Sequence, residues 1–408
     1  GMFAFAVWDR ESESLFLARD RIGIKPLYYA VLPDGRLVFA SELKAVALHP
    51  ALARDMDPAA VEDYFAFGYI PEPRTIFRGA RKLPPGHRLR VERGRPVPAP
   101  AAYWDLRFHA GVGREGEAEA GAIAHLREAV RVRQEADVPL GAFLSGGVDS
   151  SAVVAMMAGE SPEPVRTSSI AFGDPAFDEG RHAAAVAARY ATDHAVREVQ
   201  ADDFDLLDRL AALYDEPFAD SSAVPTYRVC ELARDRVTVA LSGDGGDETF
   251  AGYRRYRWYI QEARVRRLLP APLRRPSFRT LAALYPKLNR APRFLRAKAT
   301  FQSLALDPLD GYLDSLAVVK APLRARLYSQ RFRNELGGYS ATEVLRRHAA
   351  NAPDHPLQRV QYLDFKTYLP GDILTKVDRA SMAHSLEVRV PVLDHQLLEW
   401  AAGIHPRL

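Results

Sequence analysis

The stretch that decides the fold is VPLGAFLSGGVDSSAVVAMMA, residues 138–158. Its apolar run ends at Leu144, and Ser145-Gly146-Gly147 separates that run from a small-residue apolar pattern that starts at Ser150. This order predicts a buried parallel strand, a glycine turn and the start of a helix. The two glycines let the backbone turn sharply and bring its amides close to a ligand.

The turn carries groups that bind phosphate. Ser145, Ser150 and Ser151 offer hydroxyl donors, and the helix N-terminus adds unpaired N–H groups with a partial positive charge. Asp149 would repel a phosphate, so its presence indicates a divalent cation between the two. The common phosphate loop, G-x-x-x-x-G-K-[ST], requires a lysine in the region where this chain has Asp149. The S-G-G-V-D-S-S run resembles instead the pyrophosphate-binding loop of the N-type ATP pyrophosphatases, which transfer AMP and release pyrophosphate.

Composition and charge limit the class of protein. With 408 residues, 48% of them hydrophobic, the chain has material for two packed domains. Its formal net charge of +3 gives no global field that favours nucleic acid or a membrane. No apolar run approaches the roughly twenty residues of a membrane span, and no signal peptide is evident. The single cysteine, Cys230, excludes an intrachain disulfide framework. We therefore expect a cytoplasmic protein with no nucleic-acid and no membrane partner.

Strands and helices alternate after residue 120. This order predicts an α/β fold with a doubly wound parallel sheet, in which ligands bind beyond the carboxyl ends of the strands. After the strand that ends at Leu144, we expect further strands over Val165–Phe172, His194–Gln200 and Val237–Leu241. The expected helices are Gly121–Arg133, Glu179–Tyr190, Phe204–Leu213 and Ala223–Arg234, with Cys230 as a buried core residue of the last. The distinctive residues follow strand ends, among them Phe172-Gly173 with Asp178 and Glu179.

The second strong motif is LSGDGGDE, residues 241–248. Its glycines allow a tight loop at a strand end, and Asp244, Asp247 and Glu248 crowd three carboxylates into five positions. Such like charges repel unless a cation or a positive substrate group joins them. The spacing does not fit the twelve-residue frame of an EF-hand. A solvated acidic loop is the alternative.

The first hundred residues are rich in β-structure. The pattern predicts an antiparallel meander of four strands, helices over 41–48 and 58–67, a loop over 68–86 and a short hairpin at Tyr103-Trp104. Arg107–Glu119 is predicted to be an interdomain linker.

The runs LARDRIGIKPLYYA and GYIPEPRTIFRGARKLPPGH resemble the rear half of a class II glutamine amidotransferase domain, an N-terminal-nucleophile glutaminase.

That resemblance implies a nucleophilic cysteine at residue 1, where this chain has Gly1. We therefore expect residues 1–106 to be a partial glutaminase domain with no glutaminase nucleophile and no glutaminase activity. Both ends of the sequence begin or stop abruptly within secondary-structure patterns, which favours a piece of a longer protein.

Both motifs, together with YLPGD (368–372) and MAHSLEVRVPVLDH (382–395), resemble the glutamine-hydrolysing asparagine synthetase family. The resemblance implies an adenine nucleotide alpha hydrolase-like sheet over 120–408, C-terminally truncated before a family lysine in a K-x-x-L-R context. It also implies roles for single residues. The ATP site would be lined by Leu144, Gly146, Phe172, Ser242 and Gly243. The pyrophosphate would be held by Ser145, Gly147, Ser150 and Ser151. The Mg²⁺ ion would be ligated by Asp149 and Asp247. Asp244 would act as base toward the incoming amine.

The implied reaction is attack of the aspartate side-chain carboxylate on ATP, giving β-aspartyl-AMP and pyrophosphate, followed by displacement of AMP by ammonia, which the complete protein would derive from glutamine. ATP, Mg²⁺ and aspartate are thus the expected ligands, and a homodimer is possible. The same architecture serves β-lactam synthetases and lasso-peptide cyclases, in which an intramolecular amine replaces ammonia. A tRNA-modifying pyrophosphatase and a catalytically incomplete binding subunit are further alternatives.

The segment Arg254–Lys298 is dense in arginine, with Glu262 as its only acidic residue. A nucleic-acid or membrane-surface patch is one interpretation. Because apolar residues separate the basic ones, we favour a solvated insertion of amphipathic helices. His384 and His395 lie in the last motif, and we expect structural roles for both.

Overall fold

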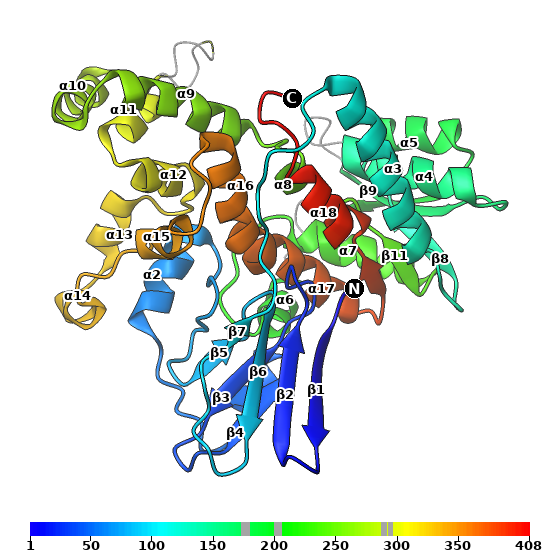
Figure 1. Cartoon of the computed structure of the whole chain (residues 1–408), viewed down its shortest axis with the longest axis horizontal. Helices are drawn as coiled ribbons and strands as arrows, with labels where there is room; N and C mark the ends of the chain where they lie inside the picture. The colour runs from blue at the N-terminus through cyan, green and yellow to red at the C-terminus, as the bar shows by residue number, and fades with distance from the viewer. Residues whose placement is uncertain (173–179, 200–205, 287–291, 293–296) are drawn as a thin grey trace.

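The computed structural model describes residues 1–172, 180–199, 206–286, 292 and 297–408. Its β-rich first part forms the lower end of the molecule in Figure 1, a parallel sheet with its helices lies on the right, and a group of helices lies on the left. None of the helices in these described ranges combines the length and the apolar character that a bilayer crossing requires.

A five-stranded parallel sheet organises the second part, as predicted. Its order is β10 (Asp193–Val199), β9 (Arg166–Phe172), β8 (Leu140–Phe143), β11 (Val239–Leu241) and β12 (Glu387–Arg389). Ala142 of β8 stands in register with Thr167 on one side and Leu241 on the other. Strand β8 is therefore central, and the turn that follows it opens at the middle of the sheet.

Helices cover both faces of this sheet, which confirms the doubly wound arrangement. Residues of α3 (Glu115–Arg133), α4 (Val148–Glu160) and α5 (Gly180–Arg189) share one core with Leu241. Residues of α6 (Leu207–Tyr214), α7 (Ala223–Arg234) and α17 (Thr375–Met382) share another with Ala240. Neighbouring residues of β11 thus face opposite cores, as a strand requires. Cys230 is fully buried in the second core, as expected.

Helix α3 begins six residues before its predicted start, so the expected linker over 107–119 is too long. Glu115 and Glu117 occupy the first turn of α3. Negative side chains there are favoured by the partial positive charge of a helix N-terminus. These acidic residues therefore belong to the helix and not to the linker.

The single meander predicted for the first hundred residues is wrong. The strands form two sheets, β1-β2-β6-β7 and β4-β3-β5. The Asp20 carboxylate accepts hydrogen bonds from the backbone N–H groups of residues 22–25 at 2.8–3.1 Å, and this turn directs the chain from the first sheet into the second. The predicted loop over 68–86 contains a strand that pairs with the third one. The bounds are β1 (Ala4–Asp9), β2 (Ser14–Arg19), β3 (Tyr28–Val31), β4 (Leu37–Ala40), β5 (Ala80–Lys82), β6 (His87–Glu92) and β7 (Ala101–Ala102).

The remaining elements are helices: α1 and α2 belong to the first part, and most of the others lie on the left of Figure 1. They are α1 (Leu43–Ala47), α2 (Pro58–Phe67), α8 (Gly246–Thr249), α9 (Arg254–Leu268), α10 (Ala271–Leu284), α11 (Lys298–Ala305), α12 (Pro308–Leu316), α13 (Ala321–Leu327), α14 (Gln330–Leu336), α15 (Thr342–Ala349), α16 (Pro356–Lys366), the π-helical η3 (Leu369–Leu374), the 3₁₀-helical η4 (Pro391–Leu393) and α18 (His395–Ala401).

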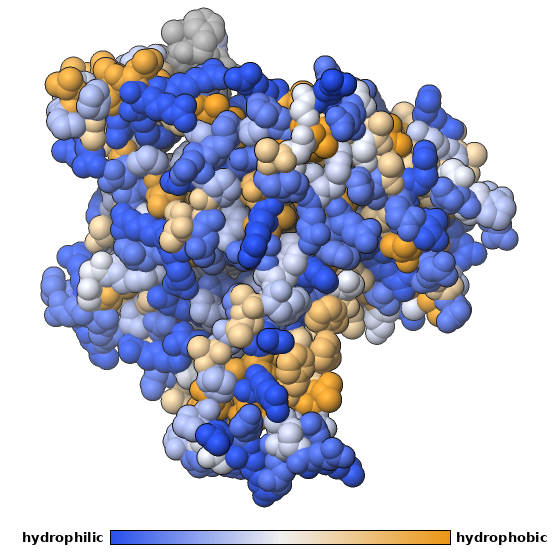
Figure 2. All heavy atoms as spheres, viewed as in Figure 1, coloured by the Kyte–Doolittle hydropathy of each residue, from blue (hydrophilic) through white to orange (hydrophobic). Residues whose placement is uncertain are grey.

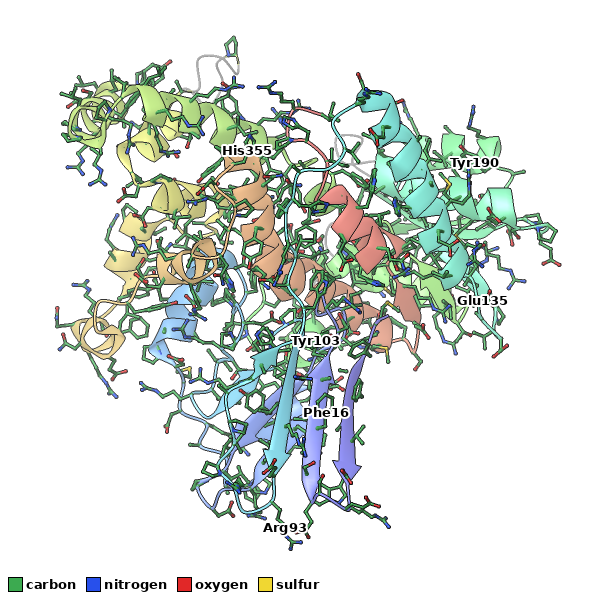
Figure 3. The ribbon with its side chains drawn as sticks, in the orientation of Figure 1. Phe16, Arg93, Tyr103, Glu135, Tyr190 and His355 are labelled. Atoms are coloured by element: carbon green, nitrogen blue, oxygen red, sulfur yellow. The ribbon has the colours of Figure 1, made fainter. Side chains whose placement is uncertain are left out.

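Ion pairs, most of them largely buried, join the first part to the second. Arg379 of α17 is 3% exposed, lies 3.5 Å from the Asp215 carboxylate and donates to the Ser41 carbonyl at 3.2 Å. Lys44 approaches the other oxygen of Asp215 at 3.1 Å. Tyr103, near this junction in Figure 3, donates its hydroxyl to the Arg19 carbonyl at 2.7 Å. Further pairs across the junction are Lys25–Asp378, Lys82–Glu216 and Glu62–Arg324.

Candidate functional site

A cavity of about 370 Å³ opens where β8 and β11 end. This is the edge at which doubly wound sheets bind ligands. Its walls come from the turn after β8, the loop after β11, helix α7 and the η3–α17 segment. The lining residues are Phe143, Ser145, Gly147, Asp149, Ser150, Thr226, Val229, Ser242, Gly243, Asp244, Gly245, Gly246, Asp247, Glu248, Tyr253, Ile373 and Val377.

The turn after β8 is held by its own hydroxyl groups. The Ser145 and Ser150 hydroxyls lie 2.9 Å apart, and the Ser145 backbone N–H donates to Ser150 Oγ at 3.2 Å. Gly146 has a φ of +79°, and a Cβ there would lie 2.4 Å from the backbone nitrogen of Ala183. Only glycine fits this position, because both the backbone conformation and the packing against α5 exclude a side chain.

Ser151 lies one residue further into α4 and does not line the cavity. Its hydroxyl oxygen is buried and has no hydrogen-bond partner among the described residues. Buried hydroxyls normally find a partner, so this group has capacity for a hydrogen bond that the described protein atoms leave unused.

The two motifs touch each other closely. A Cβ on Gly243 would lie 2.6 Å from the backbone nitrogen of Ser150, and one on Gly246 would lie 2.2 Å from Cγ of Asp149. The glycines of the second loop are therefore needed so that its backbone can pack on the first turn of α4. This packing places Asp149 and Asp247 on one cavity.

The carboxylates on this cavity lie close enough that the charge of one makes ionisation of another less favourable. Burial and then the charges of Asp247 and Asp244 raise the pKa of Asp149 from 3.8 to about 6. Burial also raises the pKa of Asp247, against the opposing effect of Arg255. Two crowded carboxylates with raised pKa values form a site that a cation would stabilise.

Asp244 is the most deeply buried of the three aspartates. The Ser242 hydroxyl donates a short hydrogen bond to its Oδ2. Burial raises the pKa of Asp244, while that hydrogen bond and the charge of Lys376 act in the opposite direction. A carboxylate with a raised pKa at a cavity wall is a better proton acceptor than an exposed aspartate.

A charged cluster behind this wall was missed by the sequence reasoning. The Lys376 ammonium of α17 donates to Asp220 Oδ2 and to Ser222 Oγ, each at 2.6 Å. Burial and then the charge of Asp220 raise the pKa of Asp372 to about 8. The available signal was the i, i+4 spacing of Lys376 from Asp372, the last residue of the YLPGD motif.

Two further cavity residues are Glu248, one of the three carboxylates of the second motif, and Tyr253, which the sequence did not single out. The Tyr253 hydroxyl donates to Glu248 Oε1 at 2.8 Å. Burial raises the pKa of Glu248 to about 7, although that hydrogen bond opposes the shift. Glu248 is therefore, like Asp149, a carboxyl group of this cavity whose raised pKa lies near neutral pH.

Most of the predicted site residues meet at this cavity. Four do not line it: Leu144, Gly146, Ser151 and Phe172. Leu144 is buried in the sheet core, and Phe172 is the last residue of β9. Gly173, Asp178 and Glu179 lie outside the described residues. His384, expected to be structural, packs edge-on against Tyr227 with ring centroids 4.3 Å apart.

The groups at the cavity suit a Mg²⁺ ion that is held partly by substrate phosphates, and not a metal ion that is held by protein ligands alone. In the described part of the chain, no three His, Cys, Asp or Glu side chains are arranged to hold an ion by themselves. Mg²⁺ is usually bound by one or two carboxylates together with substrate phosphates and water. Asp149 and Asp247 supply two carboxylates, and the adjacent turn supplies hydroxyl and N–H donors for phosphate.

Family models match the chain in two parts. A glutamine amidotransferase domain model matches residues 1–104, and an asparagine synthase model matches residues 122–408. A relative named asparagine synthetase [glutamine-hydrolyzing] 1, from Bacillus subtilis, is 30% identical over the whole chain, and a putative asparagine synthetase from Mycobacterium bovis is 35% identical over 99% of it. The chain spans 62% and 61% of their lengths. A putative asparagine synthetase from Methanocaldococcus jannaschii is 33% identical over 94% of the chain and 72% of its own length.

Proposed function

Because the chain belongs to the asparagine synthase family, we propose that it converts aspartate to asparagine with ATP and ammonia, glutamine serving as the source of ammonia only where the glutaminase nucleophile is present. The observation that carries this proposal is the contact between two loops at one cavity, where a serine-glycine turn faces a loop of carboxylates. This pairing suits a reaction in which a phosphate chain is held while a carboxylate attacks it.

The residues of the first turn would hold the leaving pyrophosphate. Ser145, Gly147, Ser150 and Ser151 supply the hydroxyl and N–H donors, and the unpartnered Ser151 hydroxyl supports that role. The nucleotide would contact Leu144, Gly146, Phe172, Ser242 and Gly243. Asp149 and Asp247 would hold Mg²⁺, which supplies charge neutralisation for the phosphates when it is bound.

The chemistry proceeds in two displacements. A side-chain oxygen of aspartate attacks the α-phosphorus of ATP, the bond to the bridging oxygen breaks, and pyrophosphate leaves. Ammonia then attacks the acyl carbon and AMP departs with the transferred oxygen. Asp244 would take a proton from the attacking amine, a role that its raised pKa supports. Lys376 would act as a positioning residue that limits how far that pKa rises.

A screen for pyrophosphate release tests the proposal. Purified protein with ATP and Mg²⁺ is incubated with each amino acid, with and without ammonium. We expect release that requires aspartate and yields asparagine only when ammonium is present. Release that requires another carboxylate and no ammonium would favour a β-lactam synthetase-like or lasso-peptide cyclase-like reaction. A cytoplasmic location, a homodimer and the absence of a nucleic-acid partner remain proposals of the same kind.

A further inference from the structure

Exposed leucines gather at the outer end of α9 and α10, at the upper left of the molecule. Figure 2 shows hydrophobic residues over this region. The relative solvent-accessible surface area is 81% for Leu268, 78% for Leu284 and 64% for Leu273. Leu269 and Leu281 are also exposed. Single exposed leucines are ordinary, but a group of five within 17 consecutive residues forms a patch that needs a partner.

Internal contacts fix this patch so that it faces outward. Arg266 of α9 donates to the Ser303 carbonyl at 3.1 Å, and Arg274 of α10 is buried and donates to the Leu306 carbonyl at 2.9 Å. Both helices are thus attached to the end of α11. Leu273 and Leu284 are eleven residues, about three helical turns, apart and lie on one face of α10. Their exposure shows that this face points away from α11.

Unpaired arginines surround the leucines. Residues 254–284 contain nine arginines and one acidic residue, Glu262. Arg255, Arg266, Arg274 and Arg275 are bound by protein carboxylates or carbonyls. In contrast, Arg264, Arg267 and Arg279, as well as Arg254 and Arg257 at the far end of α9, are exposed and form no ion pair with any other described residue. The unpaired charges that α9 and α10 carry are therefore all positive.

We propose that this leucine–arginine patch, formed by Leu268, Leu273, Leu284, Arg267 and Arg279, binds peripherally to the surface of a lipid bilayer that contains anionic lipids. Leucine side chains enter the boundary between headgroups and acyl chains, while arginines on the same segment bind lipid phosphates. This binding lies beyond the proposed function, and it replaces our expectations that the segment is simply solvated and that the protein has no membrane partner.

Other occupants fit the patch less well. A second copy of the chain would place arginines against arginines across a self-complementary interface, and like charges there repel. Nucleic acid would use the arginines, but it offers no apolar groove for a row of leucines. An anionic bilayer satisfies both kinds of side chain at once.

Vesicle flotation tests the proposal. Purified protein is mixed with phosphatidylcholine vesicles that contain or lack phosphatidylglycerol, at low and high salt. We expect flotation with the anionic vesicles that weakens as salt rises. The double variant Leu273→Ser/Leu284→Ser should reduce partitioning by at least about tenfold, and Leu273→Ile/Leu284→Ile should retain it. Arg267→Gln/Arg279→Gln should reduce both the binding and its salt dependence.

Two surface variants serve as matched controls. Leu48 is as exposed as Leu284, at 78%, but lies in the β-rich part, so Leu48→Ser should leave flotation unchanged. Arg10 is also exposed on that part, so Arg10→Gln should do the same. No flotation of the parent protein, or equal flotation of the parent and the Leu273→Ser/Leu284→Ser variant, would overturn the proposal. A dimer in analytical ultracentrifugation that this variant abolishes, without vesicle binding, would assign the patch to a second copy instead.

Discussion

Replacing Asp149 with asparagine should stabilise the ligand-free protein while weakening its binding of Mg·ATP. Asp149 lies in the first turn of α4 on a cavity that it shares with Asp247 and Asp244. Burial and these two carboxylates raise its pKa from 3.8 to about 6. At neutral pH the folded protein therefore carries an ionised group that its surroundings disfavour, and an uncharged amide removes that cost.

The magnitude follows from the pKa shift. A rise of about 2 units at about 1.4 kcal/mol each corresponds to about 3 kcal/mol of lost stability. Asp149 is only partly buried, so solvent screening reduces this figure. The N-terminus of α4 also favours a negative charge at this position, so we expect a net gain of only about 1 kcal/mol for Asp149→Asn. Because the folded pKa lies above the unfolded one, the stabilising effect of protonation is present below pH 3.8 and is lost as the pH rises through 6. The advantage of the variant should thus be small near pH 4 and complete above pH 7.

Urea unfolding in the presence of a chelator, at pH 4.5 and pH 8, measures this difference. Asp208 provides a matched control, because it also occupies the second position of a helix, α6, but is exposed. Asp208→Asn should change the free energy of unfolding by no more than about 0.5 kcal/mol at either pH. Calorimetric titration with Mg·ATP gives the second readout.

Two results would refute this reasoning. If Asp149→Asn is no more stable than the parent at pH 8, the carboxylates do not destabilise one another in the folded protein. If the variant binds Mg·ATP as tightly as the parent, Asp149 is not a ligand of the cation.

Asp247→Asn should likewise weaken Mg·ATP binding, by at least about tenfold, without unfolding the protein; equal binding in titration calorimetry would exclude Asp247 as a ligand. Gly246→Ala should also impair Mg·ATP binding, because a Cβ there would lie 2.2 Å from Cγ of Asp149, whereas Gly159→Ala, with open space around its Cβ, should not. Loss of binding in both glycine variants would contradict this explanation. Asp244→Ala should slow amide formation by about a hundredfold or more and spare pyrophosphate exchange; an equal loss of both activities would remove Asp244 from the base role.

Much of the parallel sheet could be predicted from the sequence, because β8 and β11 lie in short apolar runs and a helical pattern follows β8, β9 and β10. Helix α7 was predicted with its observed bounds. Strand β12 has only three residues, and no periodicity can be recognised over that length. The division of the first part into two sheets also escaped prediction, since it depends on hydrogen bonds of one carboxylate, Asp20, to four successive backbone amides.

At the site, the residues of the two motifs were found because glycine, serine and aspartate are grouped in the sequence. The contact of Gly246 with Asp149 joins loops that are almost a hundred residues apart, so its closeness follows from the strand order and not from any local pattern. Lys376 and Asp220 were missed for the same reason. Each is an ordinary charged residue in sequence, and only the fold places them 2.6 Å apart behind Asp244.

Transfer of labelled oxygen tests the central claim most directly. Aspartate labelled with ¹⁸O in its side-chain carboxylate is incubated with purified protein, ATP, Mg²⁺ and ammonium, and the nucleotide product is analysed by mass spectrometry. Attack of that carboxylate on the α-phosphorus predicts AMP that carries one ¹⁸O atom, formed together with asparagine. Unlabelled AMP, ADP as the nucleotide product, or no nucleotide product that depends on aspartate would contradict the proposed function.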